Sequence, residues 1–83
     1  MTDAANIIFY GTEWCFDCHQ ARRFFDEHKI PYQWVNIDQD PQAEILVKQV
    51  NRGYRSVPTI VWPDGSMLVE PSNSELAEKL GIK

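Results

Sequence analysis

The hydrophobic positions of this chain fall into short continuous runs that alternate with segments of helical periodicity. Four of the runs predict strands: residues 6–10, 32–37, 58–62 and 67–69. The first is apolar at consecutive positions before Gly11, which indicates a strand buried on both faces. The third leads into the turn sequence Pro63-Asp64-Gly65, so the third and fourth strands are expected to form an antiparallel hairpin.

Three other segments carry apolar side chains at every third or fourth position, which is the spacing of an amphipathic helix. They begin near Cys18, Asp40 and Ser72. Asp40 is followed by Pro41, a combination of N-cap and first-turn proline. Ser72 is followed by Glu75, the partner that a capping box requires. The element order is therefore βαβαββα, and residues 1–83 are expected to form a single domain.

Composition narrows the classes of function. Eight Lys and Arg residues stand against twelve Asp and Glu residues, so the chain has a net charge of −4 and lacks the basic surface that nucleic-acid backbones require. No apolar run approaches the roughly 18 residues of a membrane span. The first six residues contain neither a basic nor an apolar stretch typical of an export signal. We therefore expect a cytoplasmic monomer with no nucleic-acid or membrane partner.

The two cysteines, Cys15 and Cys18, form a C-x-x-C pair. A disulfide between them closes so short a loop that it stabilises the fold by only about 2 kcal/mol, before any strain is subtracted. A redox or metal role therefore explains the pair better than a structural one. Beside a βαβ pattern, such a pair is typical of thiol–disulfide exchange, in which one thiolate attacks a disulfide and the other resolves the intermediate.

Position assigns different roles to the two thiols. Cys15 lies at the junction of the first strand and the first helix, where free backbone N–H groups and the positive helix end favour a thiolate. Cys18 lies about one turn later on the more apolar face, which suits a resolving cysteine. Asp17 stands between them, and its negative charge is expected to raise the pKa of Cys15 relative to that with a neutral residue at this position.

The segment Ser56-Val57-Pro58-Thr59 is a second local feature. A proline at the start of a strand cannot donate a hydrogen bond to the sheet, and tight turns sometimes hold such a proline in the cis form. From the residues alone, trans is the default for Pro58. If the bond were cis and next to Cys15, the exposed backbone of Val57 would pair with a peptide-like substrate, as in strand addition.

Several side chains near the cysteines are candidates for substrate contact. Trp14 precedes Cys15 and Phe16 follows it, so both can line a substrate groove. Arg55 stands directly before the Ser-Val-Pro segment, where it can meet a carboxylate or a sugar hydroxyl of a thiol co-substrate. Arg22 is expected to be a solvated surface charge. The aromatic residues expected to pack in the core are Tyr10, Phe24, Phe25, Trp34 and Trp62.

Other interpretations of the cysteine pair stay open. Cys15 to His19 fits C-x-x-C-H, the attachment pattern of c-type haem, but no export signal accompanies it. A zinc site would use Cys15, Cys18, His19 and His28, although the two histidines are farther apart than the usual spacing allows. A metal-binding or iron–sulfur module and a redox-inactive interaction domain are the alternatives from other functional classes.

Taken in order, these motifs resemble those of glutaredoxin-like proteins, and most closely those of the mycoredoxin branch. The residues that carry the resemblance are Tyr10-Gly11-Thr12-x-Trp14-Cys15-x-x-Cys18, Arg55-Ser56-Val57-Pro58-Thr59 and Asp64-Gly65-Ser66. The resemblance spans nearly the whole chain and implies an α/β thioredoxin fold, in which three helices flank a four-stranded mixed sheet. It also implies that Cys15 is the nucleophile, that Cys18 is the resolving thiol, and that a cis Val57-Pro58 peptide forms the substrate platform.

The implied activity is reduction of protein disulfides, or of mixed disulfides with a low-molecular-weight thiol, without a bound cofactor. The places where this chain departs from typical glutaredoxins are Thr12-Glu13, Phe16-Asp17 and Glu70-Pro71-Ser72-Asn73. Their negative charges are expected to weaken binding of glutathione, which carries two carboxylates. The segment around Ser72 is more similar to that of mycoredoxins, which use mycothiol, so Ser72 is a candidate substrate-binding residue. A flavin reductase of the thioredoxin-reductase type is the alternative electron source.

Overall fold

The computed structural model describes residues 7–82, and its elements follow the predicted order. The strands are β1 (Ile8–Gly11), β2 (Gln33–Asn36), β3 (Thr59–Val61) and β4 (Met67–Val69). The helices are α1 (Phe16–Glu27), α2 (Pro41–Val50) and α3 (Asn73–Leu80). Residues 1–6 lie outside the described residues. They include Asn6, the predicted start of the first strand, and the segment that lacks the pattern of an export signal.

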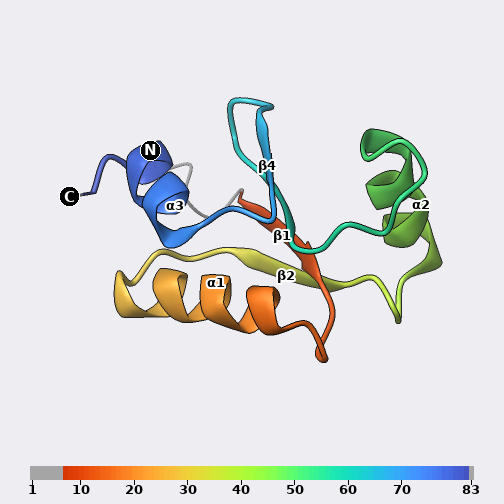
Figure 1. Ribbon diagram of the computed structural model, residues 1–83, viewed down its shortest axis with the longest axis horizontal. Coiled ribbons are helices and arrows are strands. Elements are labelled where there is room, and N and C mark those ends of the chain that lie inside the picture. Colours follow the sequence, from red (N-terminus) through yellow and green to blue (C-terminus); the bar gives the residue numbers. More distant parts are fainter. Residues whose placement is uncertain (1–6, 83) are drawn as a thin grey trace.

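The strands form one mixed sheet in the order β2-β1-β3-β4 (Figure 1). The central strand β1 runs parallel to β2, with Phe9 opposite Trp34, and antiparallel to β3, with Phe9 opposite Ile60. β3 and β4 form the expected antiparallel hairpin. β1 has a neighbouring strand on each side and helices over both faces, so Phe9, Tyr10 and Gly11 are buried and Ile8 is partly buried, in agreement with its continuous apolar sequence.

Helices cover both faces of the sheet (Figure 1). On one face, Phe9 and Ile60 pack with Phe25 of α1 and Leu76 of α3 in a single buried cluster. On the other face, Tyr10 packs with buried residues of α2 and of the β2–α2 connection, which are Ile37, Ala43 and Val47. Neighbouring residues of β1 therefore serve two separate cores, because successive side chains in a strand point to opposite faces.

The helix boundaries follow from local caps. The α1 helix begins at Phe16, two residues before the predicted start, because Cys15 acts as its N-cap. Asp40 caps α2, since its side chain accepts a hydrogen bond from the Ala43 amide. At α3 both halves of the predicted capping box are formed between Ser72 and Glu75. None of these helices is both long and apolar enough to cross a membrane, within the described residues.

Arg22 is not the solvated surface charge that the sequence suggested. Its guanidinium lies 4.0 Å from the centre of the Trp34 ring and donates a hydrogen bond to the Tyr32 hydroxyl. The same group is 3.8 Å from the Glu13 carboxylate. Helical spacing brings Arg22 over the aromatic residues of the adjacent strand segment, and the flat cation stacks well on an indole ring. Trp34 is correspondingly half-buried rather than fully in the core.

Candidate active site

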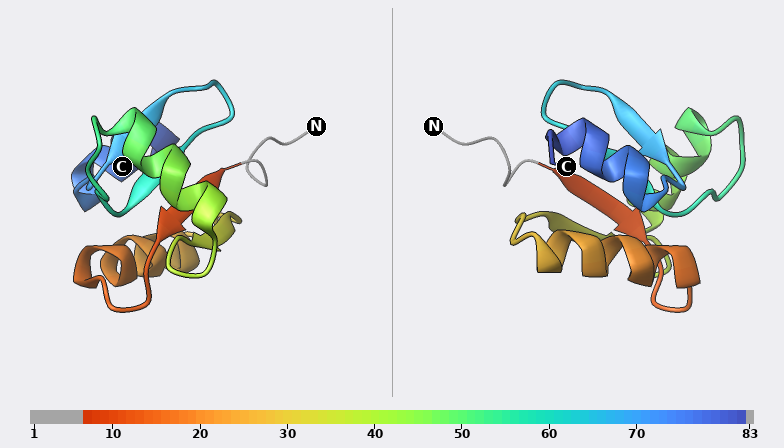
Figure 2. Two further views of the ribbon diagram at one scale, coloured as in Figure 1. Left: turned by 90° about the vertical axis from the view of Figure 1, so that its right-hand side faces the viewer. Right: turned by 60° about the vertical axis from the view of Figure 1, so that its left-hand side comes forward.

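Cys15 lies where β1 has ended and α1 begins, and Figure 2 shows the chain turning back sharply at this point. The residue has extended backbone angles, and its Sγ atom accepts a hydrogen bond of 3.1 Å from the Cys18 amide. The Cys15 sulfur therefore occupies the position of an N-cap acceptor, at the positive end of the helix. Negative charge on this sulfur is favoured by both the amide and the helix dipole.

The two thiols differ in access to solvent. Cys15 is 7% exposed, whereas Cys18 is fully buried. Burial raises the pKa of the Cys18 thiol strongly, and its hydrogen bond with Cys15 and the nearby charge of Asp17 raise it further. Cys18 therefore stays protonated at neutral pH, while Cys15 is the thiol nearer to the surface.

Gly11 makes room for the buried thiol. A Cβ atom at this position would lie 2.8 Å from the Cys18 sulfur and 2.9 Å from the Trp34 ring. Both distances are shorter than a van der Waals contact, so no larger residue fits here without a shift of the neighbouring side chains. The glycine that ends β1 thus lets the helix carrying Cys18 pack close to the sheet.

The Val57-Pro58 peptide bond is cis, as the family resemblance implied; the default of trans taken from the residues alone was wrong. The Cys15 thiol lies next to this bond and donates a hydrogen bond of 3.7 Å to the Val57 carbonyl oxygen. On the other side, the Glu70 amide donates to the Pro58 carbonyl oxygen at 2.8 Å. The loop before β3 and the residue after β4 are thereby held beside Cys15.

A groove of about 460 Å³ runs past Cys15. Its lining residues are Trp14, Cys15, Phe16, Asp17, Tyr54, Arg55, Ser56, Val57 and Glu70. The structure thus brings together most of the site residues predicted from the sequence. Cys18 and Pro58 are buried and do not line the groove. Ser72 does not line it either, and its hydroxyl instead accepts a hydrogen bond from the Glu75 amide within the cap of α3.

Tyr54 was not predicted as a site residue, although it lines the groove and is 72% exposed. The sequence feature that could have identified Tyr54 is its place as an aromatic residue in a polar loop, directly before the Arg-Ser-Val-Pro segment. Glu70 was considered only as a charge that opposes glutathione. It adopts a left-handed backbone conformation (φ 50°), which is uncommon for a residue other than glycine. A sequence pattern does not show that this conformation places Glu70 on the groove.

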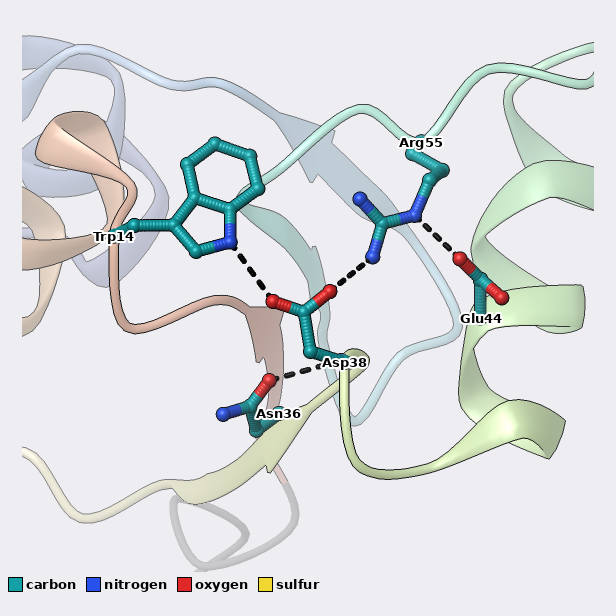
Figure 3. Close-up of polar contacts among 5 residues, drawn as sticks. All are labelled: Trp14, Asn36, Asp38, Glu44 and Arg55. Carbon is teal, nitrogen blue, oxygen red and sulfur yellow. Dashed lines mark hydrogen bonds and ion pairs between the residues drawn. The ribbon is translucent and has the colours of Figure 1, made fainter.

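A polar network supports one wall of the groove (Figure 3). The Trp14 indole donates a hydrogen bond of 2.8 Å to Asp38, and the Arg55 guanidinium bonds to the other oxygen of the same carboxylate. Arg55 also forms an ion pair with Glu44 of α2. The Asn36 side chain accepts a hydrogen bond from the Asp38 amide and so anchors that residue. Arg55 is therefore already bound by two carboxylates, rather than left free to meet a ligand carboxylate.

From this network we predict that the hydrogen bond between Trp14 and Asp38 persists to acidic pH. The hydrogen bond from Trp14, and after it that from Arg55, hold the pKa of Asp38 below its ordinary value of 3.8. We expect the NMR signal of the Trp14 indole proton to titrate with a midpoint below 3.8, and any contribution of the network to stability to be lost only as the pH falls through that midpoint. The Arg55→Gln variant should titrate at higher pH. The indole signals of Trp34 and Trp62 are internal controls, and a Trp14 midpoint at or above 3.8 would refute the contact.

The histidines of the alternative metal sites are engaged elsewhere. His19 contacts the Glu13 carbonyl oxygen through Nε2, and the His28 ring packs 4.4 Å from the centre of the Phe24 ring. Across residues 7–82, no group of three or more His, Cys, Asp or Glu side chains is placed to hold a metal ion.

Comparison with known proteins gives the family. Residues 7–67 match the family model described as Glutaredoxin. A protein of Mycobacterium tuberculosis H37Rv named as a glutaredoxin is 37% identical over 76 residues, which cover 92% of this chain and 90% of that protein. Mycoredoxin 1 of Corynebacterium glutamicum is 34% identical over 76 residues, which cover 92% of this chain and 94% of that protein.

Solved structures agree on the fold. A glutaredoxin of Archaeoglobus fulgidus superposes with a TM-score of 0.73 at 21% identity, covering 92% of this chain and 86% of that one. A thioredoxin-like protein superposes with a TM-score of 0.74 at 22% identity, covering 87% and 96%. The mixed sheet with its three helices is thus a thioredoxin fold. With its Cys15–Cys18 pair, the chain belongs to the glutaredoxin family and is a thiol–disulfide oxidoreductase.

Proposed function

We propose that the protein works as a dithiol enzyme, in which Cys15 attacks a substrate disulfide and Cys18 resolves the intermediate. The observation that carries this proposal is the Cys18 amide bonded to the Cys15 sulfur at the start of α1, with Cys18 itself buried behind it. The amide and the helix end stabilise a thiolate at the thiol nearer to the groove. The substrates are protein disulfides and mixed disulfides between a protein and a low-molecular-weight thiol.

The reaction proceeds by two exchanges. In the first, the Cys15 thiolate attacks one sulfur of the substrate disulfide, forms a mixed disulfide with it, and releases the other sulfur as a thiolate that takes up a proton. In the second, Cys18 loses its proton and attacks the Cys15 sulfur, and the bond between Cys15 and the substrate sulfur breaks. The departing substrate thiolate takes up a proton, and the Cys15–Cys18 disulfide is formed. The substrate gains two electrons, and two equivalents of a small thiol, or a reductase, return them to the enzyme.

The electron donor is proposed to be a low-molecular-weight thiol, and mycothiol in preference to glutathione. Asp17 and Glu70 line the groove, and Arg55 is already held by Asp38 and Glu44, so the site offers an anionic tripeptide little electrostatic attraction. The similarity to a protein named mycoredoxin supports the same choice.

The test is a coupled turnover assay on a mixed-disulfide substrate with three parallel electron sources. These are mycothiol with its reductase, glutathione with its reductase, and thioredoxin reductase alone. Turnover with mycothiol is the expected result. Turnover only in the glutathione arm would show that glutathione, and not mycothiol, is the electron donor. Turnover only in the thioredoxin reductase arm would make the protein a thioredoxin-like electron donor. No turnover in any arm would contradict the proposed function.

The burial of Cys18 predicts a shifted reactivity profile. In a Cys15→Ser variant, Cys18 should react with iodoacetamide far more slowly at pH 8 than an ordinary thiol does, and its rate should still rise above pH 9. The reason is that burial, the largest cause of its raised pKa, persists in the variant. Mass spectrometry of the alkylated protein measures the rate. The same variant in urea supplies the control, and a folded-state rate that levels off near pH 9 would contradict the prediction.

A further inference from the structure

The lining of the groove beside Cys15 contains two carboxylates and one guanidinium. Asp17 and Glu70 line it, and Arg55 is its one cationic residue within the described part of the chain. The Arg55 guanidinium is bonded to both Asp38 and Glu44, as Figure 3 shows. The one guanidinium of the lining is therefore already paired with carboxylates outside it, so Asp17 and Glu70 favour a positively charged ligand in the groove.

The same groove is lined by exposed aromatic rings. Trp14 is 68% exposed, Phe16 is 78% exposed and Tyr54 is 72% exposed. Trp14 and Phe16 flank Cys15 along the chain, while Tyr54 comes from the loop that leads to the cis-proline. Flat rings of this size offer apolar contact to aliphatic side-chain stems and a cation–π surface to ammonium and guanidinium groups. The combination of rings and carboxylates suits Lys and Arg side chains, which present both kinds of group.

The two groove carboxylates come from different parts of the chain. Asp17 lies in the first turn of α1, two residues after Cys15. Glu70 follows β4, and its amide is tied to the Pro58 carbonyl oxygen at 2.8 Å. A peptide that binds in the groove past Cys15 can therefore meet a carboxylate from each of these two segments.

From this arrangement we infer that the preferred protein substrates present their disulfide in a peptide segment with basic residues next to the cysteine. The inference rests on the proposed function and adds the chemistry of the partner. Cys15 attacks the peptide disulfide as described above, while Asp17 and Glu70 pair with the flanking cations and the aromatic rings cover their aliphatic stems. Acidic segments are disfavoured because like charges would meet in the groove.

The test compares two disulfide-bonded peptides that differ only in the residues flanking the reactive cysteine, which are Lys in one and Glu in the other. Two exposed charge pairs, each of about twofold to fivefold, predict that the Lys peptide is reduced roughly 4 to 25 times faster, as kcat/KM at low ionic strength. The difference should shrink in about 0.5 M salt, because exposed charges are screened. A small uncharged mixed disulfide is measured in parallel.

Variants that neutralise Asp17 and Glu70 test whether these two carboxylates cause the preference for the Lys peptide. In an Asp17→Asn, Glu70→Gln double variant, the rate ratio of Lys to Glu peptide should fall to about 2 or below. The ratio cancels any change that Asp17 makes in the intrinsic reactivity of the thiols. Glu78→Gln is the matched control, because Glu78 is an exposed residue of α3 that does not line the groove, and its ratio should equal that of the unmodified protein.

The outcomes separate this inference from the proposed function. Equal rates for the two peptides, or a ratio that the double variant leaves unchanged, would overturn the inference. Reduction of the small mixed disulfide but of neither peptide would also overturn it, and would leave the dithiol chemistry standing. Failure to reduce any of the three substrates would instead contradict the proposed function itself.

Discussion

Replacing Cys15 with serine should abolish disulfide exchange on every substrate and lower turnover to the uncatalysed background. Serine lacks a nucleophile of comparable acidity, and no second thiol in the described residues is placed at the groove. Replacing Cys18 should have a different effect. The Cys18 variant keeps the attacking sulfur and should still reduce small mixed disulfides with external thiol, whereas reduction of protein disulfides should stall at the mixed disulfide.

The two variants are compared in the same coupled assay, and the stalled intermediate is identified by mass spectrometry. Because Cys18 is fully buried, serine there would bury a hydroxyl group, so Cys18→Ala is made as well as Cys18→Ser. Circular dichroism confirms that each variant is folded. Equal residual activity in the Cys15 and Cys18 variants would refute the assignment of their roles.

Replacing Gly11 with alanine should destabilise the protein by about 1–3 kcal/mol, the usual cost of forcing an extra methyl group into a packed site. The added Cβ would lie 2.8 Å from the Cys18 sulfur, so the strain falls directly on the thiol that we propose resolves the intermediate. We therefore expect reduction of protein disulfides to slow, while attack by Cys15 on a small mixed disulfide is less affected. Urea denaturation measures the loss of stability, and stopped-flow mixing measures the resolution step.

A double variant tests whether the contact with the Cys18 sulfur causes the loss of stability. In a Cys18→Ala background the sulfur is absent, so Gly11→Ala should cost less stability than it does in the unmodified protein. The remaining cost reports the contact with the Trp34 ring, which lies 2.9 Å from the same position. An identical cost in both backgrounds would show that the Cys18 sulfur does not limit the space at Gly11.

Features set by neighbouring residues were predictable from the sequence. The continuous apolar run of β1, the Asp40-Pro41 start of α2 and the Ser72–Glu75 capping box each depend on residues within one or two turns, and each appears in the structure. The start of α1 was misplaced because a thiol is not among the usual N-cap side chains, although the Cys15 sulfur accepts the capping hydrogen bond here.

Features set by distant residues were not predictable in the same way. Arg55 binds Asp38 and Glu44, which lie 17 and 11 positions away and form no local pattern with it. Arg22 stacks on Trp34 only because the sheet and α1 pack together, so its sequence surroundings suggested a solvated charge. The form of the Val57-Pro58 bond came from the family resemblance, since the residues alone favour trans.

The distance along the chain between Cys15 and the Val57 carbonyl also matters during synthesis. β1 and both cysteines are made before β3 and the loop that contacts Cys15, and Val57 of that loop comes more than 40 residues after Cys15. At translation rates of roughly 5–20 residues per second, the nascent chain carries two unprotected thiols for several seconds before its partner segments exist. During that interval the groove has not formed and Cys18 is not buried, so neither thiol is protected from oxidants. The nascent chain is therefore more prone to form non-native disulfides than the folded enzyme is.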